Sequence, residues 1–508
     1  METKIAFSDR GSNAIENARS LPLARAINAF MASPKGLMLI ALVTVLAHLA
    51  SLEIVMYVLT LLYCIYVCIC GDDFLTLAPL CVFCYIVPSR ENNPGRSNET
   101  LFSGGTGVFL LIAVAVLVIC FLLRVRYDRN MGFKKLFSHK RALVTGMLLL
   151  GAAYLLSGIF SKHYSSIWLK NMGFGGLQFL AIFAMYFLLT ALVDWSRVRK
   201  DYFIWIGFLA GCVIAIEVFN LYLCYRGEFW QDGIDRWKIY LGWGIHNNIG
   251  AMLAVTSPFA FYLACQYKYG YFFIIPAAMI AAAMFLTFSR TSILMGIFVL
   301  GVSFIFMLRK GASRKVILTI GGGLALAGIA LVILFWGRLV SAVKDIFDNG
   351  FLDGSGRSDL YFSGFKVFVK NSVLGDGFYP TDQSVFEGAY WFLGFDLTSF
   401  FPPRWHNTIV QLLASCGIFG LITYGIHRVQ TVFMFLRKLT REKIFIGLSV
   451  LALLGMSLLD NHFFNLGPTL FYSLALAFAE KSPEQADLPG REIKEISGAP
   501  VLLQSENA

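Results

Sequence analysis

Apolar runs separated by short polar connections fill the chain from about residue 36 to about residue 479. Most runs extend over about 17–25 residues, which is long enough for an α-helix to cross the hydrocarbon core of a bilayer. Backbone polar groups in lipid must be satisfied within the segment, so such runs predict helices. We count about fourteen candidate spans, of which the first three are short, and expect an all-α polytopic membrane protein with about 12–14 transmembrane helices. The candidate spans lie near residues 36–51, 53–70, 73–88, 107–123, 142–160, 173–193, 202–224, 246–265, 271–288, 291–308, 316–336, 406–427, 443–459 and 462–479.

The composition agrees with this pattern, and the polarity changes divide the chain into five parts. Of the 508 residues, 57% are hydrophobic and only 14% are charged, whereas a soluble domain carries about 25% charged residues. The polar tail after the last span has a composition typical of disorder. The expected parts are residues 1–35 (cytoplasmic segment), 36–336 (transmembrane helices), 337–405 (external loop), 406–479 (transmembrane helices) and 480–508 (disordered cytoplasmic tail).

The distribution of basic residues predicts the orientation in the membrane. A net charge of +11 can indicate a nucleic-acid partner, but here the lysines and arginines gather in short connections between spans. Cytoplasmic connections of membrane proteins carry such an excess. Placing both termini in the cytoplasm puts the four most basic connections on that side, and no nucleic-acid partner is expected. These connections are residues 124–141, 196–200, 309–315 and 437–443.

The same orientation places the long loop of residues 337–405 outside. Loops of this length are usually functional or disordered. This one contains "GSGRSDLYFSGFKVFVKNS", an amphipathic helical pattern with Leu360, Phe365 and Phe368 as expected apolar contacts, followed by the glycine-rich turn "VLGDGFYP". We therefore expect a partly helical cap on the outer face of the membrane.

Polar residues gather at the predicted external ends of several spans. Taken one at a time they have structural explanations: an arginine can extend to lipid headgroups, an asparagine or aspartate can cap a helix, and a histidine can be buried in the core. Glu217, inside a predicted span, can serve a substrate or only bond to a neighbouring helix. The shared placement on one leaflet favours a functional cluster instead. Its members are His246, Asn247, Asn248, Arg290, Arg357, Arg404, His406, Asn407, Asp460, Asn461 and His462.

Two motifs within this cluster resemble the signatures of the O-antigen ligases. "RTSIL" at residues 290–294 matches their Arg-x-x-x-Leu signature, and "HNTIVQLLASCGIFG" at residues 406–420 matches His-Asn, nine residues, Gly-x-x-Gly without a gap. Between the motifs, the loop with "GSGR" and "VLGDG" resembles that of the O-antigen ligase and polymerase superfamily. The resemblance covers roughly residues 242–424. Both signatures in order, flanking the loop, are more specific than either alone.

The resemblance implies a multi-pass glycosyltransferase of the bacterial inner (plasma) membrane, with a GT-C-like fold and an active site that faces the periplasm or the outside. Its donor would be a glycan linked to undecaprenyl diphosphate, and its acceptor would be a glycan, a lipid or a protein. Membrane lipids are further expected partners. Such a donor carries its own leaving group. No cofactor and no metal are expected, since no nucleotide-binding or metal-binding motif occurs in the sequence.

The residue types fit this chemistry. Arginine binds phosphate bidentately and stays charged, and histidine can act as a base near neutral pH. We predict that His406 takes the proton of the acceptor hydroxyl and that Arg290 holds the diphosphate with help from Arg357 or Arg404. Asn407, beside the base, is a further predicted substrate contact. Additional predicted phosphate contacts, which the family signature does not specify, are Arg226, Arg236 and Lys238.

Three functions remain open from the sequence. A ligase and a polymerase would use the same donor and differ in the acceptor, and the intact ligase-type signatures favour a ligase slightly. A transporter or flippase for lipid-linked saccharides would be expected to show internal repeats and polar residues near the middle of the bilayer. We find no repeat in the sequence, and Glu217 is the residue that favours transport.

Overall fold

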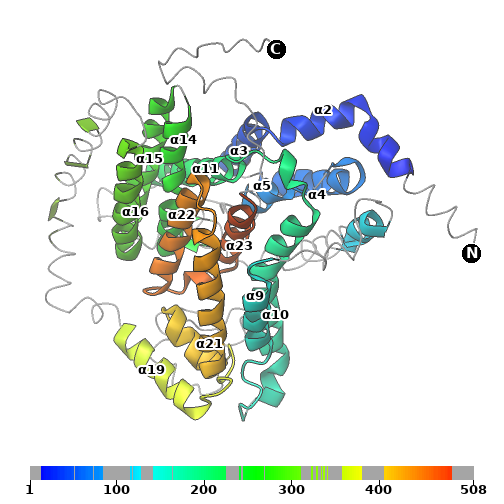
Figure 1. The fold of residues 1–508 in the computed structure, drawn as a ribbon. Helices are drawn as coiled ribbons and strands as arrows, with labels where there is room; N and C mark the ends of the chain where they lie inside the picture. Colours follow the sequence, from blue (N-terminus) through cyan, green and yellow to red (C-terminus); the bar gives the residue numbers. More distant parts are fainter. Residues whose placement is uncertain are drawn as a thin grey trace, which may run out of the picture.

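The fold is given by a computed structural model, which describes residues 13–83, 115–126, 141–224, 239–309, 357–379 and 405–482, apart from residues 51, 73, 117, 163, 242–243 and 268, together with isolated positions between residues 322 and 340. Helices dominate these ranges (Figure 1). The strand content is one antiparallel pair of two-residue strands, β1 (Tyr240–Leu241) and β2 (Gly244–Ile245). The all-α prediction is confirmed.

The helices have the following bounds. The α-helices are α2 (Pro22–Met31), α3 (Pro34–Leu49), α4 (Glu53–Cys70), α5 (Leu77–Cys81), α9 (Val144–Leu155), α10 (Tyr164–Leu192), α11 (Tyr202–Cys224), α13 (His246–Thr256), α14 (Pro258–Gln266), α15 (Ile274–Leu286), α16 (Arg290–Arg309), α19 (Arg357–Lys370), α21 (Thr408–Leu436), α22 (Arg441–Ser457) and α23 (Leu466–Lys481). Short 3-10 helices are η2 (Trp195–Arg197), η4 (Gly270–Phe273) and η7 (His462–Phe464).

Among the described residues, five helical stretches are long and apolar enough to cross a membrane, and α2 with α3 forms a sixth candidate bent by 76°. The five stretches are Ile167–Leu192, Tyr202–Cys224, His246–Gln266, Arg290–Leu308 and Thr408–Leu436. Each overlaps a span predicted from the apolar pattern. Several other predicted spans, such as residues 107–123 and 316–336, lie wholly or partly outside the described residues.

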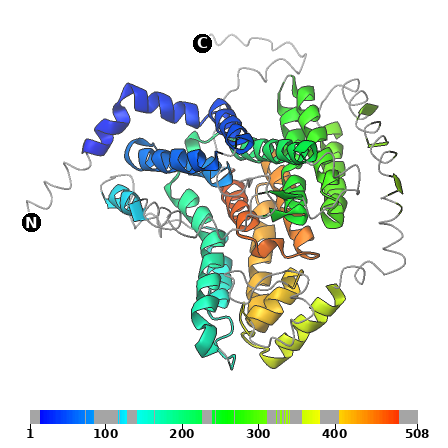
Figure 2. The same ribbon diagram turned by 180° about the vertical axis from the view of Figure 1, so that it is seen from behind.

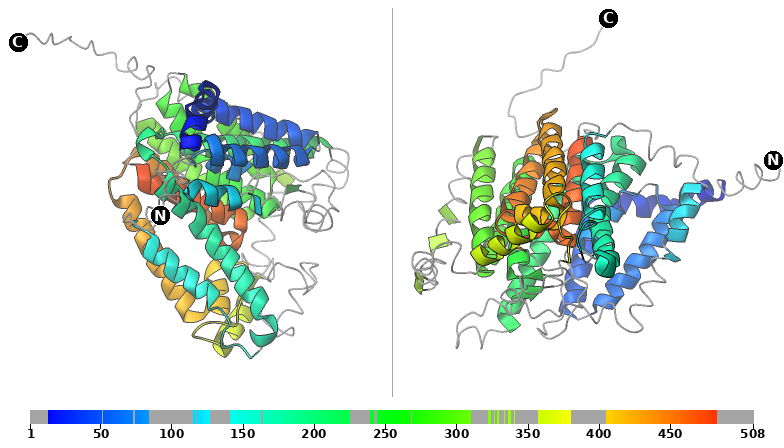
Figure 3. Two further views of the ribbon diagram at one scale, coloured as in Figure 1. Left: turned by 90° about the vertical axis from the view of Figure 1, so that its right-hand side faces the viewer. Right: turned by 90° about the horizontal axis from the view of Figure 1, so that it is seen from below.

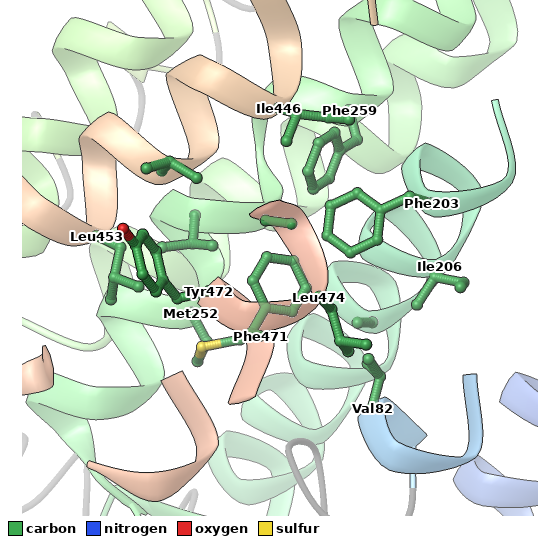
Figure 4. Close-up of a cluster of buried hydrophobic side chains, with 14 of the residues drawn as sticks. Val82, Phe203, Ile206, Met252, Phe259, Ile446, Leu453, Phe471, Tyr472 and Leu474 are labelled. Carbon is green, nitrogen blue, oxygen red and sulfur yellow. The ribbon is translucent and has the colours of Figure 1, made fainter. Parts of the chain in front are cut away.

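The core lies where α11, α13, α14, α22 and α23 meet (Figure 4). In the most apolar 18-residue window of the span formed by α13 and α14, 94% of the residues are buried, against 33% for α16, so the former is central and the latter lies at the periphery of the described helices. Phe203 of α11 packs edge-on against Phe259 of α14 with ring centroids 5.7 Å apart. Gly207 lies one turn along α11, where a side chain would collide with the Phe259 ring. A small residue at that position therefore lets the two helices approach closely.

Glu217 is buried in α11 and bonds to His48 of α3, which is also buried. A carboxylate in a membrane-spanning helix is costly unless a partner compensates it. The His48 contact provides such compensation and joins α3 to α11. This pairing gives Glu217 a structural explanation within the helix bundle.

Helix α21 is broken at Gly417, whose φ of 63° lies in the left-handed region. Glycines in a membrane-spanning helix commonly allow close helix packing. At Gly417 the structure shows a different role, because the segment after α19 inserts at the break and supplies the missing backbone bonds. The replacement bonds run from Ile418 N to Ser372 O (2.8 Å), Phe419 N to Val373 O (3.2 Å), Asp376 N to Ala414 O (2.9 Å) and Gly377 N to Ser415 O (3.0 Å).

The "VLGDG" turn is thus a docked segment rather than a surface turn. Phe378, which follows it, is fully buried, with its ring centroid 5.0 Å from that of Phe174 of α10. The Tyr379 amide donates to the Asn171 side chain of α10 at 2.9 Å. Because interior backbone groups in a membrane protein require partners, this segment can interrupt α21 without leaving those groups unsatisfied.

Helix α19 runs beside the beginning of α21 at one end of the molecule (Figures 2 and 3). Its buried residues are Gly364 and Val367, which face Trp405 and Val410. Phe365, expected as an apolar contact, is instead exposed. Helical spacing predicted an apolar face that includes Phe365. In the structure α19 packs on α21 through a different face, which carries the small residue Gly364.

Candidate functional site

Five chain segments converge near the beginning of α21. They are the starts of α13, α16 and α19, the residues just before α21, and the turn between α22 and η7. Hydrogen bonds and one ion pair link them. These contacts bring together Asn247, Ser292, Arg357, His406 and Asp460.

The centre of this cluster is a His406–Asp460 pair. The Nδ1 atom of His406 lies 2.9 Å from Oδ1 of Asp460. A carboxylate at this distance favours the tautomer that carries the proton on Nδ1, which leaves the Nε2 lone pair free to accept a proton. Nε2 makes no hydrogen bond with any residue that the structure describes, and the side chain is partly exposed.

Asp460 is contacted by three further groups. Its Oδ2 accepts a hydrogen bond from the Asn247 amide at 3.2 Å and lies 4.0 Å from the Arg357 guanidinium, and its Oδ1 accepts from the Asn461 backbone N–H at 2.7 Å. Burial alone would raise the pKa of Asp460. Its electrostatic interactions with His406, His462 and Arg357, together with the hydrogen bond to His406, outweigh burial and hold that pKa well below its usual range. The carboxylate is therefore ionised and can orient His406.

The backbone of His406 is itself unusual, with φ at 50° in a region that non-glycine residues rarely occupy. Contacts on both sides hold it there. Its carbonyl accepts from the Tyr361 hydroxyl of α19 at 3.2 Å, and the preceding Trp405 N–H donates to the Gln411 side chain at 3.2 Å. The Gln411 Oε1 also accepts from the Asn461 amide at 2.6 Å, so one side chain joins the residue before His406 to the residue after Asp460.

Asn407 caps α21, since its Oδ1 accepts from the backbone N–H groups of Ile409 (2.8 Å) and Val410 (3.1 Å). Its Nδ2 donates to the Leu458 carbonyl at the end of α22 at 2.7 Å. Both ends of the amide are engaged within the protein. The geometry gives Asn407 a positioning role at the base of the His406 loop, and its predicted contact with substrate stays a prediction.

Arg290 is the first residue of α16. The first turn of α16 packs on α13, where the Ser292 hydroxyl lies 3.4 Å from the Asn247 carbonyl. Asn247 in turn contacts Asp460, so the beginning of α16 borders the cluster. Within the described part of the chain, the Arg290 guanidinium makes no hydrogen bond or ion pair. Its charge and the helix N-terminus beneath it together suit an anionic ligand.

The remaining predicted contacts, Arg226, Arg236, Lys238 and Arg404, lie outside the described residues. From the sequence, Asp460 was placed in the external polar cluster, with a helix cap as the alternative, but it was not paired with His406, and Gln411 and Tyr361 were not singled out. No local signal could have indicated them, because Asp460 is 54 residues from His406 in sequence.

The fold and the site define a class of protein. It is a polytopic helical membrane protein in which a His–Asp pair, arginines and helix N-termini gather at one end of the spans. A family model described as O-antigen ligase matches residues 275–425, so this part of the chain is similar to the O-antigen ligases. The matched region contains Arg290, Arg357 and His406, whereas Asp460 lies beyond it. No curated protein matches the chain.

Proposed function

We propose that this protein is an O-antigen ligase-like glycosyltransferase, which moves a glycan from undecaprenyl diphosphate to an acceptor hydroxyl at the external face of the bacterial inner membrane. The observation that carries the proposal is the His406–Asp460 pair with Arg357 beside it. The similarity of residues 275–425 to the O-antigen ligases makes a lipid-linked glycan the expected donor. A lipid A core or another surface molecule is the proposed acceptor.

The geometry supports the following reaction steps. Nε2 of His406 accepts the proton of the acceptor hydroxyl as the hydroxyl oxygen attacks C1 of the first sugar. The bond from C1 to the diphosphate oxygen breaks with its electron pair on that oxygen, so undecaprenyl diphosphate leaves and the anomeric configuration inverts. Asp460 holds the Nδ1 proton and stabilises the imidazolium that forms.

The arginines provide for the charge that develops on the leaving group. The Arg357 guanidinium lies 4.0 Å from Asp460, too far for a strong hydrogen bond, so its N–H groups can reach a phosphate. No residue that the structure describes bonds to the Arg290 guanidinium, so all of its N–H groups can bind a phosphate. Preorganised cations of this kind can supply much of the transition-state stabilisation. Arg404, Arg226 and Arg236 are proposed as further contacts to the diphosphate or the glycan.

The acceptor separates the ligase from the polymerase. Purified protein in nanodiscs would be incubated in two arms. One arm contains undecaprenyl-diphosphate glycan and a lipid A core acceptor, and the other contains the undecaprenyl-diphosphate glycan alone. A ligase releases undecaprenyl diphosphate and labels the core only when the core is present. A polymerase instead lengthens the lipid-linked glycan in the donor-only arm. Movement of the intact donor between leaflets, with no carrier released in either arm, would refute a glycosyltransferase and favour a flippase.

Arg290→Ala is expected to lower kcat/KM for the donor about 100-fold, as loss of one preorganised group at a developing oxyanion commonly does. The matched control is Arg309→Ala, which removes the arginine at the opposite end of α16. The control should leave kcat/KM almost unchanged. Equal kcat/KM values for the two variants would remove Arg290 from the diphosphate site.

A further inference from the structure

Helix α19 carries an apolar face that no described part of the protein covers. Phe362, Phe365, Val369 and Val373, just past its end, are 64%, 46%, 72% and 61% exposed. Their spacing of three or four residues places them along one side of the helix, and we call them the α19 stripe. The opposite side packs on α21 through Gly364 and Val367.

The α19 stripe continues into the exposed apolar surface of α21. Backbone bonds join Ser372 and Val373 to Ile418 and Phe419, so Val373 lies beside the first turn after the α21 break. From there an exposed row runs along α21 at helical spacing. The row consists of Ile418, Ile422, Ile426, Val429, Val432, Phe433 and Leu436. In a membrane-spanning helix such a row faces lipid, so the α19 stripe extends a lipid-facing surface.

Charged residues border the α19 stripe on one side. Lys366 and Lys370 are exposed, and Asp359 lies on the same polar edge about two to three turns away. The Lys366 ammonium lies 4.8 Å from the centre of the Phe362 ring. Lysines beside an apolar face can bury their stems in lipid and keep their charged ends at the phosphates. This pattern is typical of a helix that lies in the interface of a bilayer.

We propose that α19 is an interfacial helix whose stripe is buried in membrane lipid, with Lys366 and Lys370 at the level of the phosphates. The helix begins at Arg357, which contacts Asp460. Burial of the stripe therefore fixes Arg357 and the His406–Asp460 pair at the depth of the headgroups, where a lipid-linked diphosphate resides. Assignment to the outer leaflet rests on the proposed function, whereas contact with lipid does not.

The test uses the full-length protein in nanodiscs with a fluorescent amino acid at position 365 or, as the control, at position 359. Both positions are exposed on α19, the first on the stripe and the second on the polar edge. Lipid carrying a nitroxide near its headgroup should quench the probe at position 365 more strongly than aqueous iodide does. At position 359 the order should reverse.

Stronger quenching by iodide than by lipid at position 365 would overturn the proposal. Protection of that probe from both quenchers would also overturn it, since another protein surface would then cover the stripe. Neither measurement depends on turnover, so the outcome is separate from the fate of the proposed reaction. The quenching test can fail while the protein transfers glycan, and it can succeed while the protein transfers none. The two proposals can therefore fail separately.

Discussion

Replacing Asp460 with asparagine is expected to lower kcat for glycan transfer about 100-fold or more, within the range that general base catalysis contributes. The carboxylate holds the proton on Nδ1 of His406 at 2.9 Å. An amide keeps the shape but loses the charge that stabilises the imidazolium. It can also present an N–H group to Nδ1, which would favour the opposite tautomer and occupy the Nε2 lone pair with a proton.

The control is Asp359→Asn, which neutralises an exposed carboxylate of α19 and should leave kcat unchanged. Donor binding should survive in Asp460→Asn, because the arginines remain. The kcat of both variants and their affinity for the donor would be measured on purified protein. A kcat for Asp460→Asn equal to that for Asp359→Asn would show that the carboxylate does not act on the base.

Acid should not reproduce the Asp460→Asn effect in the mildly acidic range. The pKa of Asp460 is lowered in the folded protein, so its stabilising contribution is fully present above the unfolded value of about 3.9 and is lost only as the pH falls below that value. Between about pH 5 and pH 8, Asp460 therefore remains ionised and adds no pH dependence of its own.

The second large effect is expected from Gly417→Ala. Gly417 has a φ of 63°, and a β-carbon there would overlap the Val373 carbonyl of the docked segment. The left-handed conformation alone costs a non-glycine residue about 1–2 kcal/mol. The overlap must in addition be relieved by moving backbone that replaces the helix bonds of α21. We expect the protein to lose about 3 kcal/mol or more of stability, in the range of severe point mutants.

Gly425→Ala is the matched control, because Gly425 lies in the same helix with no atom near the position of a β-carbon. It should keep or slightly raise the unfolding temperature, as alanine favours helix. Thermal unfolding of the purified variants in detergent would be compared. Similar unfolding temperatures for Gly417→Ala and Gly425→Ala would show that the docked segment does not require the break.

The apolar pattern predicted much of the fold because lipid imposes helices on long apolar runs. The span predicted at residues 202–224 has the same bounds as α11. The break in α21 could not be predicted, since Gly417 lies within an apolar run and its replacement partners come from residues 372–377. A glycine at this position is compatible with a continuous helix and with a broken one. The docked segment determines which backbone bonds form.

The site was predictable in its chemistry but less so in its connections. Histidine and arginine at span ends indicated phosphate and proton transfer, and the structure brings His406 and Arg357 to the same carboxylate. The assignment of Asp460 as the partner of His406 required the tertiary structure, because the two residues belong to different helix ends. The Gln411 contacts that join them likewise depend on packing between α21 and the turn after α22.

Single-turnover release of undecaprenyl diphosphate by a His406→Ala variant tests the proposed mechanism most directly. The purified variant and the wild type would each be mixed with excess acceptor and a limiting lipid-linked glycan. We predict that both bind the donor, that the wild type releases one carrier for each glycan transferred, and that the variant does so at least about 100-fold more slowly. Release by His406→Ala at the wild-type rate would contradict His406 as the base.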